Sequence, residues 1–127
     1  MAALKSLTVL LSEKKPAWEE LMRKEIEKRG LAFRFMLKFF LPVKVNFVTQ
    51  GEQVAVVVDL GGIDITEGGV PDPDVVVYGD RDALVGLLED PSAIAYQEAV
   101  EQGAISLEAK TLKGKQVLSQ LEKFFST

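Results

Sequence analysis

The sequence predicts an α+β fold in which a sheet of about five strands is covered by helices. Apolar residues recur every three to four positions at both ends of the chain and every second position in the middle, which are the periods of helices and strands. Strands and helices do not alternate regularly, as they would in a doubly wound parallel sheet. The chain has 127 residues, 47% of them hydrophobic, and can therefore bury one core of substantial size. We expect a single domain over residues 1–127, with an amino-terminal helical segment at residues 1–41.

The amino-terminal segment is expected to contain three helices. The first covers residues 2–11, where leucines recur at helical spacing. Ser12 is expected to cap the second helix and Pro16 to lie in its first turn, where a missing backbone N–H costs little. The third is the aromatic stretch LAFRFMLKFFLP, whose only charges are Arg34 and Lys38. Such a helix is either deeply packed or faces an apolar environment.

From Val43 onward, apolar residues occupy every second position, which is typical of strands. Strands are expected near residues 43–47, 54–60, 63–66, 74–78 and 104–110, and the first two are expected to form a hairpin. The remaining helices are expected after Asp80, before Gly103 and after Gly114.

Composition excludes the commonest catalytic chemistries. The chain contains no Cys and no His, so it has no thiolate nucleophile, disulfide, imidazole base, or Cys- or His-based metal site. The glycines of residues 61–69 do not follow a phosphate-binding pattern, and the aspartates of residues 72–82 do not follow the spacing of a calcium-binding loop. We therefore expect no catalytic residue, no metal and no cofactor, and a protein that is not an enzyme.

Charge is distributed unevenly along the chain. The net charge of −4 does not suit nucleic-acid binding, so no nucleic-acid partner is expected. Residues 1–50 carry +5, residues 51–108 carry −12 and residues 109–127 carry +3. Either the basic ends pack around the acidic middle, or a basic amino-terminal face meets an anionic membrane or an acidic partner.

The amino terminus does not resemble a secretory signal. A charge interrupts its short apolar stretch, and no small-residue cleavage site follows. The chain also lacks an unbroken apolar run of about 18 residues, the length of a membrane span. A cytoplasmic protein is therefore expected.

Several stretches together resemble the sterol carrier protein (SCP2-like) lipid-binding family. The longest is DVVVYGDRDALVGLLEDPSAIAYQEAVEQGAISLEAKTLKGKQVLSQL, which has a strand, an Asp-capped helix, an Asp-Pro, a helix ending at Gly, a second strand and a final helix. SEKKPAWEELM and VNFVTQGEQVAVVVDL also fit the order of that family, so the resemblance covers most of the chain from about Ser12. Ala109 and the aromatic stretch at residues 31–42 depart from the family pattern.

The resemblance implies a five-stranded sheet covered by helices, with an apolar tunnel between the two layers. Such a tunnel implies noncatalytic binding or transfer of a fatty acyl, sterol or isoprenoid lipid. We predict from the alternation of strand faces and the apolar sides of the helices that it is lined by Phe33, Met36, Phe40, Phe47, Val56, Val58, Val77, Leu84, Leu88, Ile105, Leu107, Leu121 and Phe125.

One alternative binding function remains open at this stage, and an enzyme that uses Asp or Lys chemistry ranks third. The same apolar surfaces could instead join two subunits, for example in a homodimer, with the cavity closed and no lipid bound. A copurifying lipid distinguishes the two, because only the carrier interpretation requires one.

Overall fold

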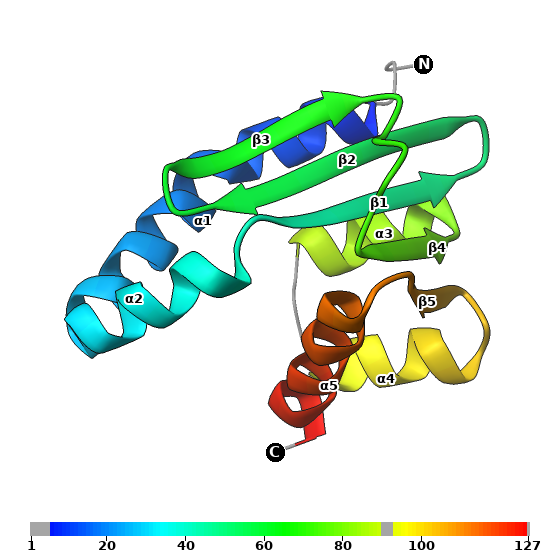
Figure 1. Cartoon of the computed structure of the whole chain (residues 1–127). Helices are drawn as coiled ribbons and strands as arrows, with labels where there is room; N and C mark the ends of the chain where they lie inside the picture. Colours follow the sequence, from blue (N-terminus) through cyan, green and yellow to red (C-terminus); the bar gives the residue numbers. More distant parts are fainter. Residues whose placement is uncertain (1–5, 90–92, 127) are drawn as a thin grey trace.

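The computed structural model describes residues 6–89 and 93–126, without the side chains of Ala93 and of residues 121–126. It contains five helices and a five-stranded mixed sheet, which confirms the predicted α+β class (Figure 1). The elements in chain order are α1 (Leu7–Arg29), α2 (Leu31–Phe40), β1 (Val43–Thr49), β2 (Glu52–Asp59), β3 (Gly62–Glu67), β4 (Val75–Gly79), α3 (Arg81–Glu89), α4 (Ala93–Glu101), β5 (Ile105–Ala109) and α5 (Leu112–Ser126).

The strands are arranged in the order β3-β2-β1-β4-β5. β1 and β2 pair antiparallel around the turn at Gln50 and Gly51, as the predicted hairpin requires. β2–β3 and β4–β5 are also antiparallel, whereas β1 and β4 run parallel. The connection from β3 to β4 must therefore cross the sheet, and it passes β2 and β1 before β4 begins (Figure 1).

The core lies between one face of the sheet and the helices. The register aligns Phe47 with Val54 on one side and Val77 on the other, so these three side chains share a face. α1, α3, α4 and α5 all contribute side chains that pack against this face. The buried cluster is Leu7, Leu11, Val54, Val56, Ile63, Val75, Val77, Leu84 and Ile105. Full burial of a Leu or Val side chain contributes about 1.5–3 kcal/mol, so this cluster is a major source of stability.

α1 is one continuous helix, and the predicted break at Ser12 is wrong. Its N-cap is Ser6, whose Oγ accepts a hydrogen bond from the Val9 N–H. Ser12 instead donates its hydroxyl to the Thr8 carbonyl within the helix, and Pro16 lies in the helix interior. The sequence pattern misled because Ser is a favoured N-cap residue and a Pro is tolerated near the start of a helix, so the pair resembles a helix start. None of the helices in the described part of the chain is long and apolar enough to cross a membrane.

Glu52 connects the start of α1 to the sheet and to α3. Its Oε2 accepts a hydrogen bond from the backbone N–H of Leu7, and its Oε1 accepts one from Arg81. A carboxylate at a helix amino terminus stabilises the helix dipole. α1 has no acidic residue in its own first turn, so β2 supplies that charge.

The opposite face of the sheet is covered at its centre by the connection from β3 to β4. Asn46 of β1 is 3% exposed, and its side-chain amide bonds to both backbone groups of Val70. The Nδ2 donates to the Val70 carbonyl at 2.8 Å, and the Oδ1 accepts from the Val70 N–H at 3.0 Å. The neighbours of Asn46 in the adjacent strands, Ala55 and Val76, are also buried. At Val70, the crossing segment is therefore fixed to the sheet by the side chain of Asn46.

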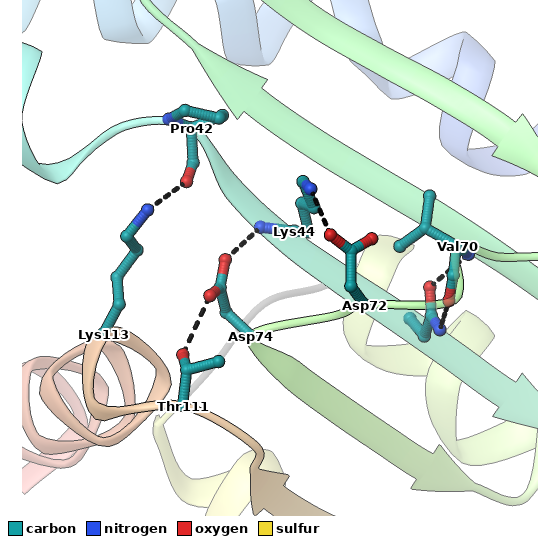
Figure 2. A network of polar contacts seen from close by, with 8 residues as sticks. Pro42, Lys44, Val70, Asp72, Asp74, Thr111 and Lys113 are labelled. Carbon is teal, nitrogen blue, oxygen red and sulfur yellow. Dashed lines mark hydrogen bonds and ion pairs between the residues drawn. The ribbon is translucent and has the colours of Figure 1, made fainter.

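A second polar group, Asp74, joins β1, β4 and α5 (Figure 2). The Asp74 carboxylate accepts hydrogen bonds from the Lys44 N–H at 2.9 Å and from the Thr111 hydroxyl at 2.8 Å. The Thr111 Oγ1 in turn accepts from the Gly114 N–H at 2.9 Å, so Thr111 caps α5. Gly114, expected before this helix, lies inside its first turn. Lys113 reaches from the same turn to the carbonyl of Pro42 (Figure 2).

Candidate functional site

An apolar cavity lies between the sheet and the helices α3, α4 and α5. Its volume is about 260 Å³. β1, β4 and β5 form its floor. The described residues that line it are Val45, Phe47, Val75, Val77, Leu84, Leu87, Leu88, Tyr96, Ile105, Leu107, Val117 and Leu118.

The floor of the cavity follows from strand register. Phe47, Val77 and Leu107 are aligned across β1, β4 and β5, and Val45 and Val75 form the next row. Side chains two residues apart on a strand point to the same face. Three short strands thus place a continuous apolar surface beneath the helices.

Leu84 of α3 forms part of the wall, and a glycine makes its position possible. A Cβ on Gly79, the last residue of β4, would come within 2.9 Å of the Leu84 side chain. Because Gly79 has no side chain, α3 can pack closely over the end of β4. Leu84 is 4% exposed, so this packing excludes water from that end of the cavity.

Tyr96 is the one polar side chain among the described residues that line the cavity. The other lining residues provide no carboxylate, amine or hydroxyl to the interior. A pocket with so few polar groups offers little to hold ordered water and can take up apolar molecules. The arrangement can therefore hold an apolar ligand, with one aromatic hydroxyl group in its wall.

The structure brings together six of the thirteen residues predicted to line the tunnel. These six are Phe47, Val77, Leu84, Leu88, Ile105 and Leu107. Val56 and Val58 share their strand face but pack in the core beside Ile63 and Ile65 of β3, near α1. Phe33, Met36 and Phe40 lie on α2, away from the described lining. The side chains of Leu121 and Phe125 lie outside the described residues.

Six lining residues were not among those predicted. Val45 and Val75 could have been found, because they lie two residues from Phe47 and Val77 on the same strand faces. The spacing of apolar residues did not single out Tyr96, because the apolar and polar sides of helix α4 are only weakly separated. Leu87, Val117 and Leu118 lie on helix faces that the sequence already marked as apolar.

A larger hollow of about 380 Å³ lies between α1, α2 and the turn from β2 to β3. Its lining mixes apolar and charged side chains, among them Glu19, Arg23, Glu27 and Arg34. Charged groups are costly to strip of water, so this hollow suits an apolar chain less well than the smaller cavity. We therefore identify the cavity beneath α3, α4 and α5 as the candidate ligand site.

The shifted pKa values belong to surface ion pairs rather than to the cavity. A hydrogen bond from Lys44 lowers the pKa of Asp72, and one from Lys110 lowers the pKa of Glu108. The same bonds raise the pKa values of the two lysines. None of these four residues lines the candidate site. Their titration therefore concerns ion pairs on the protein surface and not the binding of a ligand.

Comparisons with solved structures identify the fold. No protein-family model matches the sequence, and no curated protein matches it. The solution structure of palmitated sterol carrier protein 2-like 2 from Aedes aegypti aligns with a TM-score of 0.53 and 15% identity, over 97% of this chain and 96% of that one. A ubiquinone synthesis protein described as UbiJ-SCP2 aligns with a TM-score of 0.49 and 14% identity, over 84% of this chain and 92% of that one.

Part of a larger enzyme also aligns. The inverting sec-alkylsulfatase from Pseudomonas sp. gives a TM-score of 0.45 and 21% identity over 67% of this chain, but only 12% of the sulfatase is covered. The alignment with the Aedes aegypti structure covers almost the full length of both chains. Because the sequence identity is only 15%, this alignment establishes the architecture alone. On this evidence, the chain has the sterol carrier protein 2-like fold.

Proposed function

We propose that the protein binds a single apolar chain, such as a fatty acyl or isoprenoid lipid, in the cavity beneath α3, α4 and α5. The observation that carries this proposal is a lining of apolar side chains with one aromatic hydroxyl. The structural neighbour from Aedes aegypti is palmitated, which supports the same class of ligand. We propose binding and transfer without covalent chemistry, since the chain has neither Cys nor His and the described lining offers no acid or amine.

The size of the cavity favours a slender ligand. Its 260 Å³ lies just below the roughly 300–1,000 Å³ of usual ligand sites. A sterol, which the resemblance to the sterol carrier protein family also implied, is bulkier than a single chain and suits this volume less well. Burying about a dozen methylenes gives roughly 10 kcal/mol, against about 4–15 kcal/mol lost on association. We therefore expect a modest affinity, which suits a carrier that must also release its ligand.

A substitution that fills the cavity tests the proposal. In Val117→Phe, the larger ring occupies space that the ligand needs. If it displaces about two methylenes at ~0.8 kcal/mol each, the affinity for a fluorescent fatty acid falls by about tenfold or more. Fluorescence titration measures this change, and native mass spectrometry of the protein from its own host shows whether a lipid copurifies.

The matched control is Val58→Phe. Val58 is also half-buried against the core but does not line the cavity. Both changes overpack the interior at a cost of about 1–3 kcal/mol, so urea unfolding should show similar losses of stability. Equal loss of affinity in both variants, or no lipid and no binding in the unmodified protein, would rule out the cavity as a ligand site.

The sequence suggested two further partners, of which the proposal includes one, the membrane. The positive charge of residues 1–50 favours an anionic membrane as the place of ligand exchange, in the cytoplasm. The homodimer stays a prediction of the alternative interpretation, in which apolar surfaces join two subunits. Sedimentation velocity tests it, since a lipid-free dimer that dissociates when apolar surface residues are changed would favour assembly over carriage.

A further inference from the structure

α2 presents an apolar side to solvent. Leu31 and Phe39 are 85% and 80% exposed, and Phe35 and Met36 are 62% and 58% exposed. Positions 31, 35 and 39 form one stripe along a helix, and the rings of Phe35 and Phe39 meet edge to face at 5.5 Å. No side chain of α2 is buried. Deep packing, one of the two environments that the sequence allowed for this helix, is therefore wrong.

The stripe is bordered by two cations. Leu31, Arg34, Phe35 and Lys38 line one shallow groove of about 250 Å³. α2 contains no acidic residue, and neither Arg34 nor Lys38 has an ion-pair partner among residues 6–89 and 93–120. Apolar and cationic groups therefore share a single surface.

The carboxylates of the neighbouring helix do not cancel this charge. Along the second half of α1, Glu20 and Glu27 pair with Arg23, and Glu25 pairs with Arg29. These three acids have basic partners on their own helix, and the Glu19 carboxylate accepts a hydrogen bond from the Ile63 N–H of β3. The surplus charge of the hairpin formed by α1 and α2 is therefore positive, and the turn between these two helices lies at the end of the molecule remote from β5 (Figure 1).

We propose that α2 docks on anionic bilayers by lying in the membrane interface. Phe35 and Phe39 enter the boundary between headgroups and acyl chains, while Arg34 and Lys38 contact lipid phosphates. Pairing with a second copy is disfavoured, because it would bring the cations of two α2 helices together with no acid on either helix to offset them. Docking of α2 on a membrane does not depend on the ligand cavity. Only the statement that the protein exchanges its lipid at that membrane rests on the proposed function.

Vesicle cosedimentation tests the docking. The unmodified protein is expected to bind vesicles of phosphatidylcholine and phosphatidylserine in equal parts more tightly than vesicles of phosphatidylcholine alone, and less tightly as salt is added. Phe35→Ser with Phe39→Ser should weaken binding by at least about tenfold, because the groups that enter the interface are lost. Arg34→Gln with Lys38→Gln should weaken binding to the anionic vesicles by about fivefold for each cation.

Two matched variants serve as controls. Ile94→Ser with Val100→Ser removes exposed apolar groups from α4, and Lys14→Gln with Lys15→Gln makes the same change in net charge on α1. Both should retain vesicle binding. Failure of the unmodified protein to bind either vesicle, or equal losses in the controls, overturns the proposal.

Two measurements separate other outcomes. Fatty-acid titration without vesicles shows whether the cavity still functions, so the failure of docking and the failure of ligand binding are distinguishable. Sedimentation velocity shows whether the α2 face is covered by a second copy. A dimer that Phe35→Ser with Phe39→Ser converts to monomer would overturn membrane docking.

Discussion

Gly114 lies where α5 passes closest to the start of β4. A Cβ at this position would overlap the carbonyl oxygen of Asp74, which already accepts a hydrogen bond from the Lys110 N–H. Gly114→Ala should therefore destabilise the protein by about 1–3 kcal/mol, although Ala is about 1 kcal/mol better than Gly in a helix interior. Urea unfolding measures the change.

Gly86 is the control for that substitution. It lies inside α3 with open space around its Cα, so Gly86→Ala should leave stability unchanged or raise it by up to about 1 kcal/mol. Opposite signs for the two variants would establish the close contact between α5 and the start of β4. A gain in both would contradict it.

A second prediction for single residues concerns Asp72. The hydrogen bond from Lys44, 2.8 Å long, holds the pKa of this carboxyl below its ordinary value. Lys44→Met removes that bond, so the pKa of Asp72 should rise, as measured by NMR titration of the side-chain carboxyl. Glu108, whose pKa Lys110 lowers, is the internal control and should not move.

The sign of the pH dependence follows from the direction of the shift. Because folding depresses the pKa of Asp72, the ionised pair stabilises the fold above the ordinary pKa of an aspartate. That contribution is lost as the pH falls through the lower, folded value. Lys44→Met should therefore reduce the loss of stability on the acid side, and an unchanged acid profile would mean that the pair is broken in solution.

At the scale of elements, the continuity of α1 makes a prediction about two serines. Ser6 caps α1, so Ser6→Ala should cost about 1 kcal/mol. Ser12 is exposed in the second turn of the helix, where Ala is the better helix former, so Ser12→Ala should be neutral or slightly stabilising. Thermal unfolding followed by circular dichroism compares them. A larger loss of stability for Ser12→Ala than for Ser6→Ala would indicate that a helix begins at Ser12, as the sequence suggested.

The elements also show which features the sequence could predict. Alternation assigned Phe47, Val56 and Val77 to one face of the sheet, and the register confirms it. Alternation could not tell that α1 packs near Val56 while α3, α4 and α5 enclose Phe47 and Val77, because the helix that covers a strand is decided by the strand order. That order depends on the parallel pairing of β1 with β4, a contact between distant segments.

α2 illustrates a second limit of the same kind. Its apolar sequence predicted a helix correctly, but the pattern did not decide whether the apolar side faces a core or solvent. A helix gains stability from an inward apolar stripe only where a partner surface exists. In this fold the sheet is covered by α1, α3, α4 and α5, so the outward side of α2 stays exposed.

At the scale of the whole molecule, we predict that residues 1–127 unfold as one domain. The only tryptophan, Trp18, lies on α1 and packs against the core cluster. Its fluorescence should therefore change at the same urea concentration as the circular dichroism signal of the whole chain. An earlier fluorescence transition would mean that the amino-terminal helical segment unfolds separately.

The two hydrogen bonds between Asn46 and Val70 make these positions unequal in their tolerance to mutation. Both bonds use main-chain atoms of Val70, which every residue except proline also carries. Asn46 contributes a donor and an acceptor from one side chain, and no aspartate or leucine of similar size can supply both. We therefore expect substitutions of Val70, other than by proline, to preserve both bonds, and substitutions of Asn46 to lose at least one of them.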